Sequence, residues 1–293
     1  MIAYLNGTFV EKEKVAISPD DRGFLFADGV YEVIRSYDGR LFEFDAHLHR
    51  LKYGLDQLRI RGANLNEIRD VSTRLISENS LAEGDTTVYV QITRGAAPRT
   101  HCFPPPETEP TVYAFARRFQ PSADVQQKGV KVILVPDQRW SRCDIKTTGL
   151  LPNTLANQRA KESGAFEAIF VRDGAILEGS HTNVFFVKDG SLITAPQSNY
   201  ILTGVTRNIV LGLADKLSIP IQERSFFEAE LHTADEAFLS GTTVEITPVT
   251  QINSVMVGTG TCGVLTTKLQ SAFFDLIDFE RKKRESTNGS MTK

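Results

Sequence analysis

The sequence predicts a two-domain protein that mixes helices and strands, in the α+β or α/β class. Its 293 residues exceed the usual size of one hydrophobic core. Segments with helical periodicity and segments with strand alternation occur in both halves. A polar, unpatterned stretch over residues 119–128 is the best candidate for a linker. We therefore expect a small N-terminal α/β domain over 1–118, a larger domain over 129–285 and a disordered tail over 286–293.

Composition and charge narrow the functional classes. The chain has 36 acidic and 33 basic side chains, and this balance does not suggest nucleic-acid binding. No run approaches the ~20 apolar residues of a membrane span, and no basic-plus-apolar leader opens the chain, so we expect a cytoplasmic protein. Cys102, Cys143 and Cys262 are far apart and odd in number, which predicts neither a disulfide framework nor a zinc site.

The N-terminal half opens with a hairpin. Asn6-Gly7 is a strong signal for a type I′ turn between two short strands. Alternation after residue 29 predicts a strand with Tyr31, Val33 and Arg35 on one face. Leucines at helical spacing follow Asp45, which suits an N-cap. We expect strands at residues 2–5, 8–10, 30–37, 86–93 and 111–117, and helices at about 45–58 and 66–79.

His47 and His49 lie on the first of these helices, beside Arg50. Residues two apart on a helix point about 200° away from each other, and no acidic or cysteine partner stands at metal-ligand spacing. We therefore expect exposed or capping histidines here, and no metal site.

A loop rich in glycine and proline follows the strand at 86–93 and spans residues 94–106. Arg99 and His101 are two apart, so in an extended segment they point to the same side. A guanidinium beside an imidazole suits a carboxylate, and a solvated loop is the alternative interpretation. Because loops held by strands often carry function, this pair is a candidate binding site.

The C-terminal half predicts a sheet of several short, mostly antiparallel strands with helices. Turn signals at Asp173-Gly174 and Asp189-Gly190 separate the β-prone runs, and Gly164 ends one helix. The expected strands cover 130–135, 168–171, 175–177, 184–187, 191–194 and 236–239, and the expected helices cover about 153–163, a segment through 209–217, and 266–283.

Lys146 sits just beyond the apolar strand at 130–135, among polar residues. An amine forms an imine with a carbonyl compound only when it is unprotonated. Partial burial, or the neighbouring cations Arg139 and Arg142, would lower the pKa of this lysine toward that state. A solvated surface lysine is the alternative.

The same half offers three further polar features. Glu178 ends an apolar strand. Thr203-Gly204-Val205-Thr206 leads into a helix, where free backbone N–H groups and a hydroxyl suit a phosphate. A second hydroxyl-rich turn, Ser240–Thr243, follows the strand at 236–239. Each turn alone is weak evidence, because glycine and threonine often cap helices. Together with Lys146, they are the protein contacts that pyridoxal phosphate needs.

Six segments, taken in order, resemble the signature of the class IV (fold type IV) aminotransferases, which use pyridoxal 5′-phosphate. The resemblance covers nearly the whole chain and is greatest for the D-amino acid (D-alanine) transaminase branch. The segments are Asp28–Val33, Thr93–His101, Arg142–Lys146, Glu178–Phe185, Leu202–Arg207 and Thr242–Pro248.

This resemblance implies roles for the cofactor residues. Lys146 would carry the cofactor as a Schiff base and shuttle the substrate proton, and Glu178 would pair with the pyridine nitrogen. The implied phosphate contacts are Arg50, Val205, Thr206 and Thr242.

The resemblance also implies substrate contacts and a homodimer. Tyr31, Arg99 and His101 would bind the α-carboxylate, the last two reaching in from the other subunit. The implied reaction converts D-alanine and 2-oxoglutarate to pyruvate and D-glutamate. Further implied residues near the substrate or the cofactor ring are Val33, Trp140 and Leu202.

Several residues depart from the pattern of that branch. His181 and Thr182 stand where serines are expected, and Arg35 and Thr203 replace lysines. The segment Thr147-Thr148-Gly149, which follows Lys146, also differs. These departures leave the preferred substrate side chain open, but not the cofactor.

Other functions are compatible with parts of the sequence. A branched-chain L-amino acid aminotransferase or an aminodeoxychorismate lyase shares the implied fold and the pair Lys146 and Glu178. A metal hydrolase using His47, His49 and His101 is a hypothesis from a different class, as is a non-catalytic binding protein.

Overall fold

The structure is a computed structural model that describes residues 1–288. Its contacts divide the chain into two compact units. Unit 1 comprises residues 1–120 and 145–150 together with the chain from residue 280, and unit 2 comprises residues 121–144 and 151–279. The stretch that carries Lys146 therefore belongs to unit 1, although it follows the expected linker along the chain.

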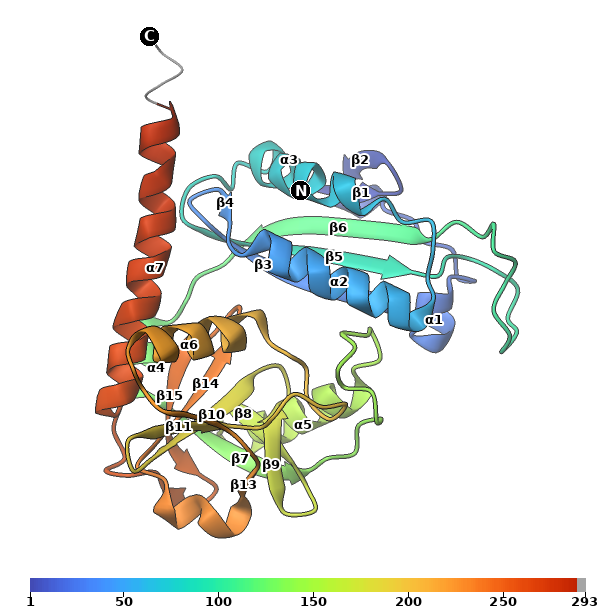
Figure 1. Ribbon diagram of the computed structural model, residues 1–293. Coiled ribbons are helices and arrows are strands. Elements are labelled where there is room, and N and C mark those ends of the chain that lie inside the picture. Colours follow the sequence, from blue (N-terminus) through green and yellow to red (C-terminus); the bar gives the residue numbers. More distant parts are fainter. Residues whose placement is uncertain (289–293) are drawn as a thin grey trace. The chain divides into compact units, whose positions relative to one another are not determined.

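Unit 1 is built on a six-stranded antiparallel sheet in the order β2-β1-β6-β5-β3-β4. The hairpin predicted at Asn6-Gly7 is confirmed, since these residues have φ of 44° and 86°, as a type I′ turn requires. The strands are β1 (Ile2–Leu5), β2 (Thr8–Glu11), β3 (Gly29–Tyr37), β4 (Arg40–Leu41), β5 (Asp85–Thr93) and β6 (Thr111–Arg118) (Figure 1). The helices are α1 (Arg22–Phe26), α2 (Phe44–Leu58) and α3 (Ile68–Glu78), with 3-10 turns at Lys12–Lys14 and Leu65–Glu67.

The two faces of this sheet carry different side chains. Alternation along β3 places Val30, Glu32 and Ile34 on one face, where α2 and α3 pack and form the core of the unit. Tyr31 and Val33 point to the opposite face, as predicted, and both are half-buried. Glu32 is thus a charged residue on an otherwise apolar, helix-covered face.

The start of α2 differs from the prediction. Its N-cap is Glu43, with φ 50°, rather than Asp45, and no side chain caps the helix. Asp45 instead lies in the first turn, where its Oδ1 accepts a hydrogen bond from Arg69 Nη2 at 2.5 Å. An acid is favourable anywhere in the first turn because of the helix dipole. Its presence was therefore a valid signal for the helix start but did not fix the position.

Unit 2 holds a ten-stranded sheet with the main path β12-β11-β10-β14-β15-β7-β8-β9-β13, and β16 pairs with β15. Most pairings are antiparallel, as predicted, but β7 is parallel to β8 and β15, and β11 is parallel to β12. A further pairing of β9 with β10 closes β10-β14-β15-β7-β8-β9 into a ring. The strands are β7 (Val130–Pro136), β8 (Glu167–Arg172), β9 (Ala175–Gly179), β10 (Asn183–Lys188), β11 (Ser191–Thr194), β12 (Ile221–Glu223), β13 (Phe226–Phe227), β14 (Glu236–Gly241), β15 (Glu245–Ile252) and β16 (Val255–Met256).

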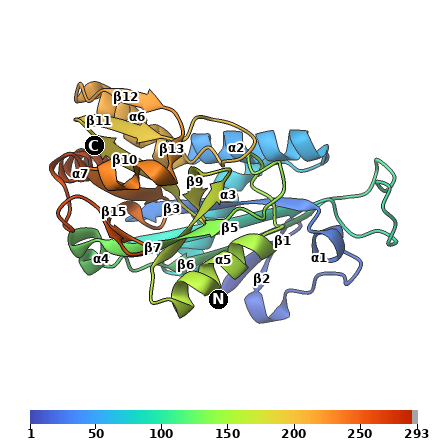
Figure 2. The ribbon, with the colours of Figure 1, turned by 90° about the horizontal axis from the view of Figure 1, so that it is seen from below.

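The helices of unit 2 cover this sheet. Helix α5 (Leu151–Glu162) packs Ala156 and Ala160 against β7 and β8, and Figure 2 shows α5 near β7. Helix α6 (Val205–Lys216) contacts β14. A 3-10 turn spans Glu228–Thr233. Helix α4 (Ala123–Lys128) occupies part of the stretch expected to be a linker.

The last helix, α7 (Val264–Asn288), extends past its predicted end at 283 and into the expected tail. The remainder of that tail, residues 289–293, lies outside the described residues. No helix in the described chain is both long and apolar enough to cross a membrane.

Gly95 lies in the loop after β5, and Gly190, in the turn between β10 and β11, is a matched control for a test of packing there. Both have positive φ, but a Cβ at Gly95 would lie 1.9 Å from the Glu109 carbonyl oxygen, whereas a Cβ at Gly190 would have no described atom within 4 Å. We expect Gly95→Ala to lower the free energy of unfolding by about 3 kcal/mol or more, because strain and a clash add. Gly190→Ala should cost only about 1 kcal/mol. If denaturant unfolding shows that both variants lose the same free energy of unfolding, the close approach of Gly95 to the Glu109 carbonyl would be contradicted.

Candidate active site

Main-chain contacts fix Lys146 at the start of β3. The Tyr31 N–H donates to the Lys146 carbonyl at 3.0 Å, and Val30 forms a β-bridge with Thr147. The Lys146 Nζ lies 4.4 Å from the centroid of the Tyr31 ring. The candidate reactive amine and the candidate carboxylate-binding tyrosine are therefore neighbours within unit 1.

Close packing of α2 explains why this stretch lies there. Ile145 is buried in the core of unit 1. A Cβ on Gly54 of α2 would lie 2.9 Å from Val30 Cγ1 and 3.6 Å from Ile145 Cγ2. Because Gly54 has no side chain, α2 can approach both residues closely. Burial of Ile145 then brings the next residue, Lys146, against the sheet.

Glu32 is a carboxylate with no exposed surface beneath α2. It accepts a hydrogen bond from His47 Nδ1 at 2.7 Å, and it accepts two from Arg50, from Nε at 2.7 Å and Nη2 at 2.9 Å. Burial alone would raise the pKa of Glu32, but the positive charge of Arg50 and the hydrogen bonds from Arg50 and His47 outweigh it and hold that pKa well below its ordinary value. Glu32 therefore stays ionised and fixes the Arg50 guanidinium.

The prediction of an exposed or capping histidine was wrong for His47. This side chain is buried, and its Nδ1 donates to Glu32, whereas His49 is exposed. Burial lowers the pKa of His47, and the positive charges of Arg50 and Lys146 add to that effect against the opposing pull of Glu32. His47 therefore serves as a neutral donor to a buried carboxylate.

Tyr31 belongs to an aromatic pair on the face opposite α2. Its ring stacks on Tyr89 with the centroids 5.6 Å apart, and Tyr89 Oη donates to Gln91 Oε1 at 2.7 Å. Burial raises the pKa of the Tyr89 phenol, so its hydroxyl stays protonated. The pair gives the lysine an apolar neighbour with a fixed ring orientation.

Arg99 and His101 share one contact within this chain. The Arg99 Cζ lies 5.1 Å from the centroid of the Phe26 ring, and the His101 ring centroid lies 5.7 Å from it. Both side chains are exposed. Arg99 and His101 thus point to the same side of the loop, as predicted, and both lie against Phe26 of α1.

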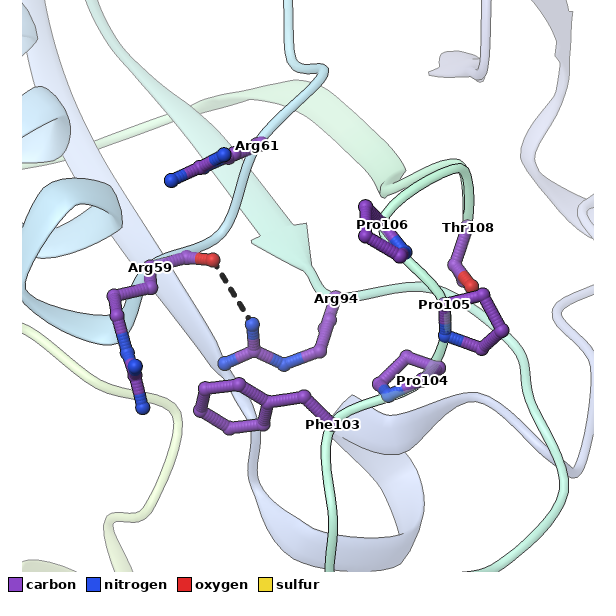
Figure 3. A pocket seen from close by; sticks show the side chains of 8 residues that line it. All are labelled: Arg59, Arg61, Arg94, Phe103, Pro104, Pro105, Pro106 and Thr108. Carbon is purple, nitrogen blue, oxygen red and sulfur yellow. Dashed lines mark hydrogen bonds between the residues drawn. The ribbon is translucent and has the colours of Figure 1, made fainter.

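A basic pocket of about 200 Å³ lies at the root of this loop (Figure 3). Arg94 is buried there and donates to both oxygens of Asp28 and to the carbonyls of Leu58 and Arg59. Its Cζ lies 3.7 Å from the Phe103 ring centroid. Arg94 thereby ties the loop that presents Arg99 and His101 to the end of α2 and the start of β3.

Glu178 occupies the end of β9 in unit 2 and is buried. Its Oε1 accepts from Arg139 Nη1 at 2.5 Å, and its Oε2 accepts from the Leu202 N–H at 2.9 Å and from Asn183 Nδ2 at 3.1 Å. One guanidinium and two N–H groups therefore hold the carboxylate in a single orientation.

Arg139 and Arg142, which precede Lys146 in the chain, are both paired with carboxylates. Arg142 pairs with the carboxylate two residues along the chain, and Arg139 pairs with Asp137 and Glu178. Burial would lower the pKa of Arg139, but the hydrogen bond to Asp137 and the charge of Glu178 raise it. Arg139 therefore supports Glu178.

Asn183 links this carboxylate to the start of α6. Its Nδ2 also donates to the Leu202 carbonyl at 2.9 Å, and its Oδ1 would lie 2.1 Å from a Cβ on Gly204, the N-cap of α6. Val205 and Thr206 follow as the first, buried residues of the helix. The predicted helix N-terminus is therefore confirmed, and it adjoins the strand end that carries Glu178.

Ser240 adds an unsatisfied hydroxyl to the same region. It pairs with Asn183 across β10 and β14, so the two side chains share a face of the sheet. Its Oγ is buried and has no hydrogen-bond partner among the described residues. Leaving such a group unpaired costs about 1–3 kcal/mol, which indicates a place for a ligand. Thr242, half-buried, follows in the turn after β14.

Trp140 is exposed, and its carbonyl accepts from Cys143 Sγ at 3.2 Å. Burial raises the pKa of the Cys143 thiol to about 11. The thiol therefore stays protonated and serves as a donor in the loop that precedes Lys146, with no reactive role.

Each unit gathers part of the predicted site. Unit 1 brings together Lys146, Tyr31 and, through Glu32, Arg50, whereas unit 2 brings together Glu178 and the start of α6. Among residues 1–288, no group of three or more His, Cys, Asp and Glu side chains is placed to hold a metal ion. The supporting residues that the sequence did not reveal are Glu32, His47, Arg139 and Asn183.

A signal for one of these residues was available. Glu32 stands between Val30 and Ile34 on an apolar strand face, where a charge must find partners. His47 and Arg50 are three apart on a helix and so lie on the same side of it. The pattern predicts some ion pair for Glu32, but the register of α2 over β3 comes only from the structure.

Comparison with known proteins decides the family. The family described as Amino-transferase class IV matches residues 29–252, well over half of the chain. The chain belongs to this family. It is 39% identical to the D-alanine aminotransferase of Staphylococcus haemolyticus, over 94% of this chain and 97% of the relative. It is also 39% identical to that of Bacillus licheniformis, over 97% and 99% of the two chains.

Solved structures of the family resemble this one. The branched-chain amino acid aminotransferase of Escherichia coli has a TM-score of 0.87 and 28% identity over 94% of each chain. A second branched-chain amino acid aminotransferase, solved with pyridoxamine 5′-phosphate, has a TM-score of 0.85 and 25% identity over 94% of this chain and 93% of that one. The expected fold type IV architecture is therefore confirmed, and the chain is a class IV aminotransferase that acts on amino acids and 2-oxo acids.

His47 and His49 provide a matched pair for a pH test. The pKa of His47 is lowered in the folded protein, so acidification below the ordinary value of about 6.5 protonates the unfolded chain first and reduces stability. We expect stability to fall as the pH drops below about 6.5, by at most ~1.4 kcal/mol per pH unit. His47→Gln should flatten this slope, whereas His49→Gln should keep it. Thermal unfolding across this range is the measurement, and equal slopes in both variants would contradict the assignment.

Proposed function

We propose that the chain catalyses pyridoxal 5′-phosphate-dependent transamination of D-amino acids, converting D-alanine and 2-oxoglutarate to pyruvate and D-glutamate. The observation that carries this proposal is the 39% identity to D-alanine aminotransferases over nearly the full length of both chains. The class IV family and a neighbouring fold containing pyridoxamine 5′-phosphate support the cofactor. A cytoplasmic location stays a prediction.

The residues of unit 2 fit such a cofactor. Glu178 is a buried carboxylate aimed by Arg139 and Asn183, which suits a protonated ring nitrogen. Ser240 Oγ is a buried hydroxyl without a described partner. The cofactor supplies an electron sink for the electron pair left when the Cα proton of the substrate is removed. The role of Glu178 is to hold negative charge where that ring must stay positive.

Lys146 and Arg50 would contribute from unit 1. Lys146 would hold the cofactor covalently and then act as the base that takes and returns the substrate proton. Arg50 would bind the phosphate, and Glu32 keeps its guanidinium in place. The remaining phosphate contacts proposed are Val205, Thr206 and Thr242, because an anion is favoured at the start of α6.

Stereochemical choice would depend on a fixed substrate carboxylate. We assign Tyr31, Arg99 and His101 to that carboxylate, with Arg99 and His101 supplied by the second subunit of a homodimer. Their exposure against Phe26 leaves both side chains accessible to another chain. With the carboxylate and the base both fixed, only one enantiomer presents its Cα–H to Lys146. Val33, Trp140 and Leu202 are the further residues that we assign to the substrate or the cofactor ring.

A branched-chain L-amino acid aminotransferase is the second candidate. The likeness to the Escherichia coli branched-chain enzyme favours it, with a TM-score of 0.87, but the identity of 28% is lower than for the D-alanine enzymes. An aminodeoxychorismate lyase of the same fold is the third candidate. Substrate choice decides between the first two.

Donor preference tests the proposed reaction. D-alanine with 2-oxoglutarate should give pyruvate and D-glutamate, and L-alanine, L-leucine and L-valine should be poor donors. Arg99→Ala should raise KM for D-alanine and for 2-oxoglutarate about tenfold or more, since each loses a charge-assisted contact worth ~1.5–3 kcal/mol. Arg117→Ala, at an exposed arginine of β6 in the same unit, is the control and should leave both KM values unchanged. Preference for L-leucine over D-alanine would favour the branched-chain reaction instead.

Lys146 should be the lysine that carries the cofactor. Borohydride reduction followed by peptide mass mapping should place the pyridoxyl group on Lys146. Lys146→Ala should lower turnover by at least ~100-fold, because it removes a positioned base. Lys161→Ala, at an exposed position of α5, should keep turnover. A pyridoxyl group mapped to another lysine would refute the assignment.

A further inference from the structure

Glu167 is a second fully buried carboxylate of unit 2, at the first position of β8. Its Oε1 accepts from Ser180 Oγ at 2.6 Å and from the Ala168 N–H at 2.8 Å. Its Oε2 accepts from the His181 N–H at 3.3 Å and from Thr182 Oγ1 at 3.1 Å, and it lies 2.8 Å from His181 Nδ1. Three consecutive side chains of one turn thus converge on a single carboxylate.

This turn, residues 179–182, connects Glu178 directly to Asn183. These two flanking residues are paired across β9 and β10, and within the turn the Gly179 N–H donates to the Thr182 carbonyl at 2.7 Å. A Cβ on Gly179 would lie 2.1 Å from Thr182 Oγ1 and 2.9 Å from Glu167 Oε2. The turn therefore packs onto Glu167 so closely that only glycine fits at its first position.

We propose that Glu167 is a positioning residue of the cofactor site: by holding turn 179–182 it fixes the directions of Glu178 and Asn183, and it orients the His181 imidazole at the edge of that site. This inference rests on the proposed pyridoxal phosphate function.

His181 extends the argument toward the site itself. Its side chain is 46% exposed, although its Nδ1 is held by Glu167. Its carbonyl oxygen would lie 3.6 Å from a Cβ on Gly241, the residue before Thr242. The turn is therefore bordered by Glu178 on one side and by the proposed phosphate turn on the other. A carboxylate bonded to one ring nitrogen fixes the orientation of an imidazole.

Only a carboxylate can serve these donors. Burial alone would raise the pKa of Glu167, but the hydrogen bonds and charge of His181 and the hydroxyl of Ser180 lower it, so the group is ionised. A glutamine in its place would turn an NH₂ group toward donors that need an acceptor. Glu167→Gln should therefore loosen the turn without changing the size of the side chain.

Glu236→Gln is the matched control. The Glu236 carboxylate accepts from the Leu265 N–H and from the N–H and hydroxyl of Thr266 at the start of α7. It lies at the opposite end of β14 from Ser240. The control variant therefore also replaces a carboxylate that accepts several hydrogen bonds in unit 2. Its position is at the end of β14 away from the proposed cofactor residue Ser240.

The test measures cofactor binding as well as rate. Apoprotein is titrated with pyridoxal 5′-phosphate, and the visible circular dichroism of the bound cofactor is recorded. We expect Glu167→Gln to raise the Kd roughly tenfold or more and to lower kcat by a similar factor with little change in KM, as for other residues that orient a site. Its visible circular dichroism band should also weaken. Glu236→Gln should lower the thermal midpoint but keep the Kd and the band of the wild type.

Two results would overturn the inference: Glu167→Gln with the Kd and band of the wild type, or equal cofactor losses in both variants. If Glu167→Gln fails to fold, Ser180→Ala removes one donor to Glu167 with a smaller change, and the same Kd and band comparison decides. Failure of the proposed function is distinct, because the wild-type protein would then bind no pyridoxal 5′-phosphate and develop no visible band.

Discussion

A carboxylate that is buried away from water must accept hydrogen bonds from donors within the protein. Three buried glutamates in this structure fix the positions of the residues around them in this way. Glu32 draws His47 and Arg50 of α2 onto β3. Glu178 accepts hydrogen bonds from Arg139, Asn183 and the Leu202 main chain. Glu167 accepts hydrogen bonds from the turn that follows Glu178. Removing one partner of a buried charge costs several kcal/mol, so these clusters have little freedom to rearrange. The side chains proposed to meet the cofactor are rigid because buried charges require it.

Local patterns in the sequence were sufficient for much of the fold. The hairpin at Asn6-Gly7, the strand around Tyr31 and the helix after Gly204 follow from turn chemistry and periodicity, and the structure confirms them. What local patterns do not contain is the partner of a residue far away in the chain. The buried state of His47 depends on Glu32 of a neighbouring strand, and the parallel pairing of β7 with β8 and β15 depends on long connections. The α4 helix, short and polar, carries no periodic signal at all.

The same distinction between local patterns and distant partners applies to the candidate site. The sequence indicated which residue types could do the chemistry, namely Lys146, Glu178 and the hydroxyl-rich turns, because these stand at strand ends and helix starts. It did not indicate that the Arg139 guanidinium supports Glu178. Arg139 and Glu178 are far apart in sequence, and their pairing arises from the way β7 and β9 flank β8. Candidates for reacting groups can thus be proposed from their local context, whereas the partners that orient them come from the structure.

The pairing of Glu178 with Asn183 closes the ring of strands in unit 2. This pairing limits where insertions and deletions can be accepted during evolution. Side chains alternate across a strand, so one inserted or deleted residue between these two would send one of them to the other face. The loop at Asp173-Gly174, at the other end of β9, faces no such restriction, because it joins β8 to β9 as an ordinary hairpin tip. Insertions and deletions should therefore accumulate at that tip and be absent from the four residues after Glu178, whatever substitutions those four positions accept.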